Sequence, residues 1–277
     1  MKKKTFIIKR SGEKETFSLK KLKESLKRCG ASGKEIDKVI EAIKPMVYDG
    51  ITTKEIYRKA FSILKKNSRT LASKYSLKNA LFELGPTGYP FERLVSALLK
   101  IEGYKTEVGV TLQGKCVSHE IDVLAEKDDY VFTIECKFHS KSQFITNVRV
   151  PLYINSRFID VQTEWNNSSK RNNYLKQGWL VTNTKFTLDA IKYAECVNLK
   201  LLSWDYPKNN GLRKNIDDFS LYPITTLTTI TKSEKEQIIE NGIILIKELN
   251  EAPGVLDKIG ITPVRVKRIL NEVKKLM

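Results

Sequence analysis

The chain has 277 residues, a length that suits two or three domains better than one. Its net charge of +17 favours a polyanionic partner, and residues 1–86 hold most of the excess, with 22 Lys and Arg against 9 Asp and Glu. The 4 cysteines show no C-x-x-C spacing, which argues against a zinc site or a disulfide framework, and no apolar run reaches membrane-spanning length. We expect a soluble, cytoplasmic protein with no membrane partner.

The N-terminal third predicts a β-hairpin followed by helices. Residues 5–10 and 13–17 read as strands around a Ser-Gly turn. Helix starts are expected at Ser18, at the capping boxes Ser32-Gly33-Lys34-Glu35 and Thr52-Thr53-Lys54-Glu55, and near Arg69. The Gly85-Pro86-Thr87-Gly88 run then ends a first domain, residues 1–86.

This domain resembles the ATP-cone, a nucleotide-sensing module of ribonucleotide reductases and of a bacterial transcriptional repressor. The match is carried by Ile8-Lys9-Arg10-Ser11-Gly12, by Glu15 to Leu22, and by Asp49 to Ile56. The resemblance implies ATP or dATP as a regulatory ligand, bound through Lys9, Arg10 and Lys21 with help from Glu15 and Thr53. Thr53 lies at an expected helix N-terminus, where phosphates bind well. A generic basic surface for the DNA backbone is the alternative for these cations.

The central segment predicts a mixed sheet flanked by helices. A helix is expected from Gly88 to about Leu99, followed by three meandering strands, a helix over 147–165, a strand over 178–184, a helix over 186–196 and a strand over 199–204. Two of the meandering strands carry Glu120-Ile121-Asp122-Val123 and Ile134-Glu135-Cys136-Lys137. Strand alternation puts Glu135 with Lys137, and Glu120 with Asp122, while Ile121 and Val123 are buried.

A turn at residues 127–129 joins these two strands, so Asp122 is expected across from Glu135. Two carboxylates suit Mg²⁺ or Mn²⁺, with the carbonyl of Cys136 as a third ligand. Lys137 would orient or help deprotonate the attacking water and neutralise charge at a phosphate. The plain alternative is an exposed strand face decorated with ions.

The order of elements over residues 87–206 resembles the PD-(D/E)xK restriction-endonuclease fold, particularly its Mrr-like branch. The resemblance implies a nuclease domain at 87–207 with catalytic Asp122, Glu135 and Lys137, and with Glu92 on the first helix as an accessory acid. Of the two histidines, His139 is the better site candidate by strand parity, provided that the strand extends that far. His119 is expected to be a polar rim residue.

The last third predicts a linker at 208–220 and a small helical module at 221–277. Its four short helices resemble a helix-hairpin-helix or SAM-like module. A Gly260-to-Pro263 turn before a helix bearing Arg265, Lys267 and Arg268 could bind a phosphate. A packing or oligomerisation domain is the open alternative.

The expected fold class is therefore a multidomain α/β (α+β) protein. The predicted function is a Mg²⁺-dependent DNA endonuclease controlled by ATP or dATP, in restriction or defence against foreign DNA. The alternatives are a nucleotide-responsive DNA-binding regulator without cleavage, a repair or recombination nuclease, and an RNA-directed nuclease. A homo-oligomer is expected, a dimer or larger, because cutting both DNA strands usually takes two active sites.

Overall fold

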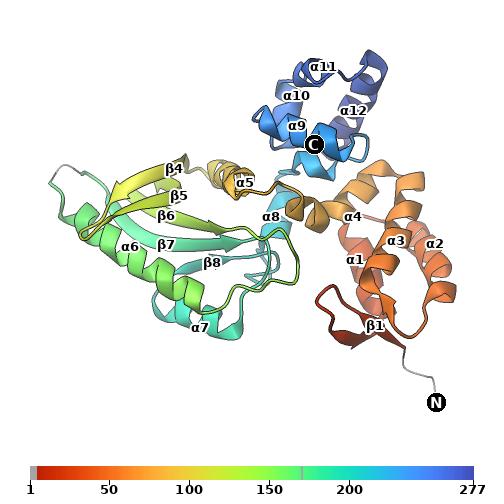
Figure 1. Cartoon of the computed structure of the whole chain (residues 1–277), viewed down its shortest axis with the longest axis horizontal. Helices are drawn as coiled ribbons and strands as arrows, with labels where there is room; N and C mark the ends of the chain where they lie inside the picture. The colour runs from red at the N-terminus through yellow and green to blue at the C-terminus, as the bar shows by residue number, and fades with distance from the viewer. Residues whose placement is uncertain (1–4, 170) are drawn as a thin grey trace.

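The computed structural model describes residues 5–169 and 171–277, so the first four residues of the expected domain 1–86 lie outside it. The described residues form a three-stranded sheet, a five-stranded sheet and 12 α-helices, which confirms a mixed α/β, multidomain chain. Three lobes are visible: an N-terminal lobe, a sheet lobe, and a C-terminal helical lobe above their junction (Figure 1).

The N-terminal lobe is a small sheet covered by helices. Strand β1 pairs antiparallel with β2 and parallel with β3. The predicted capping boxes Ser32/Glu35 and Thr52/Glu55 both form, which explains where the second and third helices begin. The elements are β1 (Phe6–Ile8), β2 (Lys14–Thr16), α1 (Leu19–Arg28), α2 (Gly33–Ile43), the 3-10 turn η1 (Lys44–Met46), β3 (Ile51–Thr52), α3 (Thr53–Asn67) and α4 (Arg69–Phe82).

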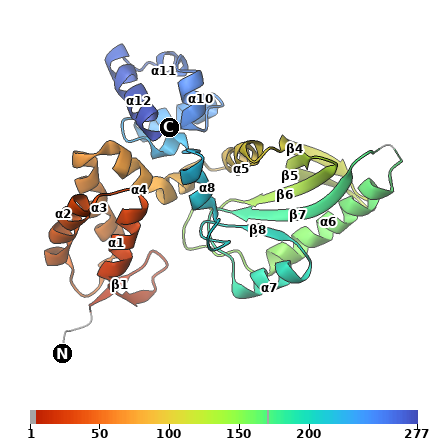
Figure 2. The same cartoon turned by 180° about the vertical axis from the view of Figure 1, so that it is seen from behind.

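The sheet lobe has the strand order β4-β5-β6-β7-β8. The first three strands form an antiparallel meander, whereas β6, β7 and β8 are parallel because α6 and α7 make the crossovers. Helix α5 covers one face, and α6 and α7 cover the other (Figures 1 and 2). The elements are α5 (Tyr89–Ile101), β4 (Lys105–Gln113), β5 (Ser118–Lys127), β6 (Tyr130–Lys137), α6 (Arg149–Asn167), β7 (Tyr174–Thr182), α7 (Leu188–Cys196) and β8 (Lys200–Leu202).

Strands β5 and β6 pair from their shared turn up to Val123 and Ile134, and then separate. The next pair in this register is Asp122 and Glu135, as predicted. Ile121 and Val123 are both buried, but Ile121 packs with the α6 core and Val123 with the α5 core. Their expected placement on one face is therefore wrong. The neighbouring Gly109 of β4 lies between the pairs Val108–Val123 and Val110–Ile121 and has φ +68°, a left-handed conformation that favours glycine.

The segment 208–220, expected to be a linker, is folded. Helix α8 (Leu212–Asp218) lies within it, and Leu212 and Ile216 are buried in the main core. Polar residues surround these two apolar positions, but their spacing of four places them on one helix face. The connection between the sheet lobe and the C-terminal lobe is therefore a packed element.

The C-terminal lobe shares its core with the rest of the chain. One buried apolar cluster runs from Leu77 in α4 through α5 and the sheet to Leu276, so the boundary expected at residue 86 cuts through packed residues. The first α-helix of the lobe begins at a capping box formed by Thr231 and Glu234. The elements are η2 (Ile224–Thr226), α9 (Lys232–Glu240), α10 (Ile246–Glu251), α11 (Val255–Lys258) and α12 (Pro263–Leu276). None of the helices described is long and apolar enough to cross a bilayer.

Candidate active site and nucleotide pocket

Three carboxylates gather where β5 and β6 separate. Asp122 Oδ2 accepts a hydrogen bond from the backbone N–H of Cys136 at 2.6 Å, which ties the end of β5 to β6. Glu135 points from β6 and is only 8% exposed. Glu92, in the first turn of α5, lies close enough for the charge of Asp122 to raise its pKa and for its own charge to raise the pKa of Glu135. The predicted acids thus meet at one point.

Burial and mutual repulsion make these acids hard to ionise. Burial, followed by the charge of Asp122, raises the pKa of Glu135 to about 7. Burial, with the charges of Asp122 and Glu120, raises the pKa of Glu92 to about 7. Burial also raises the pKa of Asp122, although the N–H of Cys136 opposes this shift. A cation placed among them would remove the repulsion.

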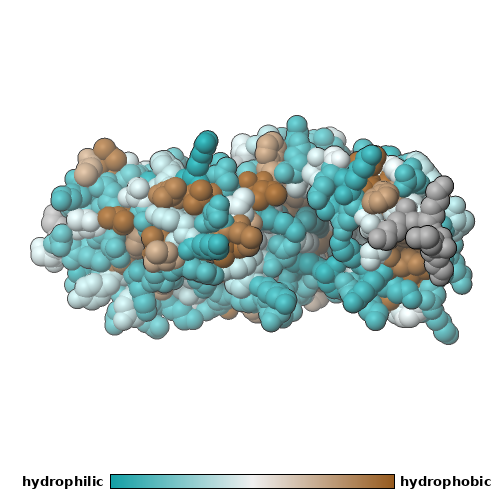
Figure 3. Space-filling view, turned by 90° about the horizontal axis from the view of Figure 1, so that it is seen from below, coloured by the Kyte–Doolittle hydropathy of each residue, from teal (hydrophilic) through white to brown (hydrophobic). Residues whose placement is uncertain are grey.

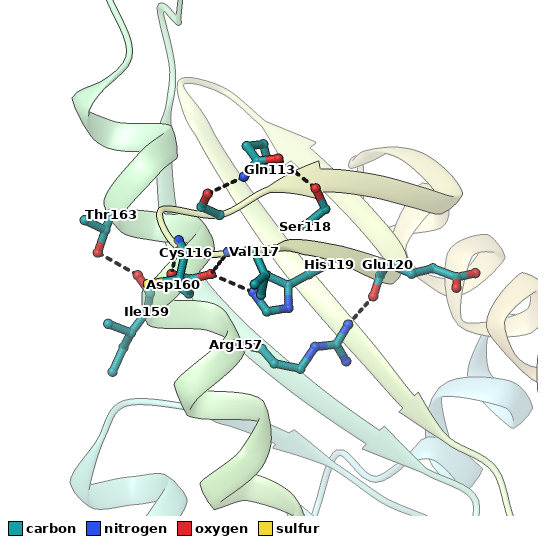
Figure 4. Close-up of polar contacts among 11 residues, drawn as sticks. Gln113, Cys116, Val117, Ser118, His119, Glu120, Arg157, Ile159, Asp160 and Thr163 are labelled. Carbon is teal, nitrogen blue, oxygen red and sulfur yellow. Dashed lines mark hydrogen bonds and ion pairs between the residues drawn. The ribbon is translucent and has the colours of Figure 1, made fainter.

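Arg157 of α6 is the partner that sequence reasoning missed. Its Nη1 donates to Glu135 Oε2 at 2.8 Å. Its Nη2 donates to the backbone carbonyl of Glu120, as Figure 4 shows. The other oxygen, Glu135 Oε1, is buried with no hydrogen-bond partner among the described residues. Arg157 sits between the buried Ile154 and Val161 on the helix, and that spacing was the available signal.

Lys137 and Cys136 occupy the end of β6. Lys137 is exposed and pairs with no carboxylate within the described ranges, while its carbonyl accepts a hydrogen bond from Thr182 Oγ1 at 2.7 Å. The Cys136 thiol is surrounded by protein, and burial raises its pKa, so it stays protonated. The Cys136 carbonyl accepts the N–H of Phe138 at 3.2 Å and keeps a second lone pair for another ligand.

Neither histidine points to the acids. His119 Nε2 bonds Asp160 Oδ2 at 2.8 Å, and Asp160 also receives the N–H groups of Cys116 and Val117, so this group anchors the β4–β5 turn to α6 (Figure 4). The bond from His119 lowers the pKa of Asp160 to about 2. His139 lies past the end of β6 and contacts Thr146 and Asn183.

Within the described ranges, no three His, Cys, Asp or Glu residues form a ready-made metal cage. The candidate ligands remain the ones predicted from the sequence: the carboxylates of Asp122 and Glu135 and the carbonyl of Cys136. The unpaired, buried oxygen of Glu135 and the repulsion among the acids fit a divalent cation here.

A second site lies where the N-terminal lobe meets the sheet lobe. Two adjoining pockets of about 420 and 310 Å³ share Lys9, Arg10 and Thr53, three of the predicted nucleotide residues. The other two, Glu15 and Lys21, line neither pocket and are paired with each other. Glu15 also pairs with Lys9, and the two lysines lower its pKa to about 2.

Comparisons with known proteins match both ends of the chain to families. Residues 5–79 match the ATP cone domain family, and residues 222–277 match the family described as AF1548-like, C-terminal. An uncharacterized protein of Archaeoglobus fulgidus is 34% identical over 184 residues, 66% of this chain and 99% of that protein. The chain belongs to the AF1548-like family. The crystal structure titled as that of the protein of unknown function AF1548 is 34% identical, with a TM-score of 0.56, and the match covers 69% of this chain and 98% of that one.

The C-terminal module of this AF1548-like chain matches a family model of its own, and its likeness to a helix-hairpin-helix or SAM-like module stays a prediction. Arg265, expected to be available for a phosphate, is already engaged: it donates to both carboxylate oxygens of Glu234 and to the carbonyl of Thr229. Helix α12 packs against α4 and α10 through its apolar face.

Proposed function

We propose that this chain is a metal-dependent DNA endonuclease of the PD-(D/E)xK type, similar to the Mrr-like branch, and that ATP or dATP bound to its ATP-cone regulates it. The observation that carries the proposal is the group of repelling acids at the fork of β5 and β6, where one oxygen of Glu135 is buried with no partner among the residues described. Such an arrangement costs folding energy and is typical of functional sites.

The residues divide the chemistry among them. Asp122, Glu135 and the carbonyl of Cys136 would hold Mg²⁺ or Mn²⁺, which when bound would neutralise negative charge on a scissile phosphate. Lys137, exposed at the end of the same strand, would position the attacking water and balance charge on the phosphate. Glu92, with its pKa near 7, can accept or give a proton close to neutral pH.

Charge supports a polyanionic substrate. The net charge of +17 favours DNA over small neutral substrates, since Lys and Arg replace the counterions of the phosphate backbone. A role in restriction or defence, and an assembly of two or more copies, follow from the resemblance to restriction enzymes and from the two-strand geometry of DNA.

The test is incubation of the full chain with supercoiled and linear DNA, with and without Mg²⁺ and ATP or dATP. We expect DNA cleavage that requires Mg²⁺ and whose rate changes when ATP or dATP is added. Glu135→Gln should lose at least about 100-fold of the activity, while Glu107→Gln, at an exposed position of β4, should keep it. The absence of Mg²⁺-dependent cleavage under all these conditions would contradict the enzyme.

A second candidate is a nucleotide-responsive DNA-binding regulator that does not cut. It is favoured by the 2.8 Å ion pair between Arg157 and Glu135, which already neutralises one of the proposed ligands. Unchanged DNA affinity in Glu135→Gln, together with no cleavage by the unmodified chain, would select this function.

A further inference from the structure

The larger pocket of the N-terminal lobe is lined by a second element from far along the chain. Besides Lys9, Arg10 and Thr53, its wall includes Ser140 to Gln143 of the loop between β6 and α6. Figures 1 and 2 show this loop beside the β1–β2 hairpin from opposite sides. In the view from below, the surface is hollowed between the two lobes and is mostly hydrophilic (Figure 3). The ATP-cone match stops at residue 79, so this wall comes from outside the cone.

Resting on the proposed nucleotide function, we propose that this loop completes the nucleotide site. Lys141 supplies a cation to the phosphates from the sheet lobe, opposite the cations of the cone. The bound nucleotide therefore bridges the two lobes through the segment that directly follows Glu135 and Lys137.

The charges of the pocket favour a polyphosphate. Arg10, Lys54 and Lys141 are exposed and pair with no carboxylate in the described chain. Lys9 is held by Glu13 and Glu15 at 3.0 and 2.9 Å, so its charge is largely balanced. Thr53 is the first residue of α3, and a helix N-terminus offers backbone N–H groups to an anion. A volume of about 420 Å³ suits a nucleotide-sized ligand, and Phe82 adds an apolar wall.

The loop is built to respond to such a ligand. Its ends are fixed: Asn183 exchanges two hydrogen bonds with the backbone of His139, and the Thr146 N–H donates to the Lys185 carbonyl at 2.8 Å. Between them, residues 140–145 make no hydrogen bond to any described residue. Phe144 stacks on His139 at 5.6 Å between the ring centroids, so phosphate contacts would add polar partners to a segment held mainly at its ends.

The loop leads directly into the candidate active site. Lys141 follows Lys137 by four residues, and Thr182, which holds the Lys137 carbonyl, leads into the Asn183 anchor of the loop. Nucleotide occupancy can therefore act on the end of β6 through covalent continuity and these anchors, without a large movement of the lobes.

The experiment measures ATP and dATP binding by the full chain by calorimetry, for the unmodified protein and for Lys141→Ala, Lys9→Ala and Lys192→Ala. Lys192 is an exposed lysine of α7 outside the pocket and serves as the matched control. We expect Lys141→Ala to weaken binding about three- to tenfold, and Lys192→Ala to leave it unchanged. Hydrogen exchange should show that ATP protects the amides of residues 140–145.

The outcomes separate the two proposals. Equal affinities of Lys141→Ala and Lys192→Ala, with no protection of 140–145 while Lys9→Ala still weakens binding, overturn the bridging loop and leave a cone that binds nucleotide alone. No binding by the unmodified chain overturns both. Weakening by Lys141→Ala with loop protection supports the bridge.

Discussion

Glu272 and Glu135 are both buried glutamates, 4% and 8% exposed, in opposite environments. Glu272 of α12 accepts bonds from the hydroxyls of Ser73 and Thr228 and from the N–H groups of Thr228 and Thr229. Burial acts to raise its pKa, but these donors outweigh burial and the pKa is lowered. Glu135 has Arg157 on one oxygen, no partner in the described chain on the other, and carboxylates as neighbours.

The difference separates a structural acid from a candidate functional one. The Glu272 carboxylate is stable as it stands, and it connects α12 with α4 of the N-terminal lobe. The Glu135 carboxylate has Arg157 on one oxygen only, and the other oxygen has no partner in the described chain. Burial alone therefore does not distinguish a functional carboxylate from a structural one in this chain. A buried carboxylate with few hydrogen-bond donors is the better candidate for function.

We expect the largest loss of stability from removing the fully hydrogen-bonded carboxylate of Glu272. Glu272→Ala leaves four donor groups without their acceptor and should lower the free energy of unfolding by about 3 kcal/mol. Glu236→Ala, at an exposed position of α9, should change it by less than about 0.5 kcal/mol. Urea denaturation near pH 7 measures both. Equal stabilities of the two variants would remove the distinction between the two buried glutamates.

The second largest loss of stability is expected from removing Arg157, the ion-pair partner of Glu135. Arg157→Ala leaves this buried carboxylate unpaired and should cost about 2 kcal/mol at pH 8, with urea denaturation as the measurement. The pKa of Glu135 is already about 7, so at pH 5 the group is protonated and the cost should shrink. Arg149→Ala, at an exposed position of the same helix, is the control. A loss independent of pH would mean that Arg157 acts through packing.

Metal addition should act on the site of Glu135 alone. At a concentration about ten times Kd, Mn²⁺ should stabilise the unmodified chain by about 1.4 kcal/mol at pH 8, measured by thermal denaturation. Below pH 6 the effect should fall, because Glu92 and Glu135 must first lose protons held with a pKa near 7. Glu135→Gln should lose the stabilisation and Glu272→Gln should keep it. Equal shifts in both variants would place the metal elsewhere.

Local patterns predicted what neighbouring residues encode. The capping boxes at Ser32 and Thr52 depend on residues three apart, and both form. The opposition of Asp122 and Glu135 follows from one short turn and the two-residue period of a strand. Each of these features depends on residues within about fifteen positions of one another, so it can be predicted from the sequence alone.

The features that depend on contacts between distant segments of the chain were not predicted. The pairing of Arg157 with Glu135 joins a helix to a strand 22 positions earlier; the spacing in α6 places Arg157 on the buried face, but no local pattern names its partner. Helix α8 lies in a polar stretch, and only the core around Leu212 and Ile216 gives it a reason to fold. The pocket wall at Lys141 exists because two lobes meet there, which the sequence of neither lobe reveals.

The smallest expected effect comes from Glu92 and tests the repulsion between its carboxylate and its acidic neighbours. The pKa of Glu92 is raised from an ordinary value of 4.5 to about 7, so between these values the folded chain holds a proton that the unfolded chain has lost. Stability therefore falls as pH rises through this window, and the penalty is complete above pH 7. Glu92→Gln removes the charge and should stabilise the protein by about 1 kcal/mol at pH 8, after allowance for the partial exposure of the side chain, and by nothing below pH 4.5.

Unfolding by urea at pH 4.5, 6 and 8 measures this difference, with Glu164→Gln, an exposed glutamate of α6, as the control. Saturating Mn²⁺ should reverse its sign at pH 8, since the unmodified chain then regains the favourable charge that the variant lacks. A gain that is the same at all three pH values would contradict the repulsion, because only an ionising group makes the effect of a substitution depend on pH. The metal-free acids at the β5–β6 fork would then be no more strained than Glu272, and the comparison between the two sites would rest on hydrogen bonds alone.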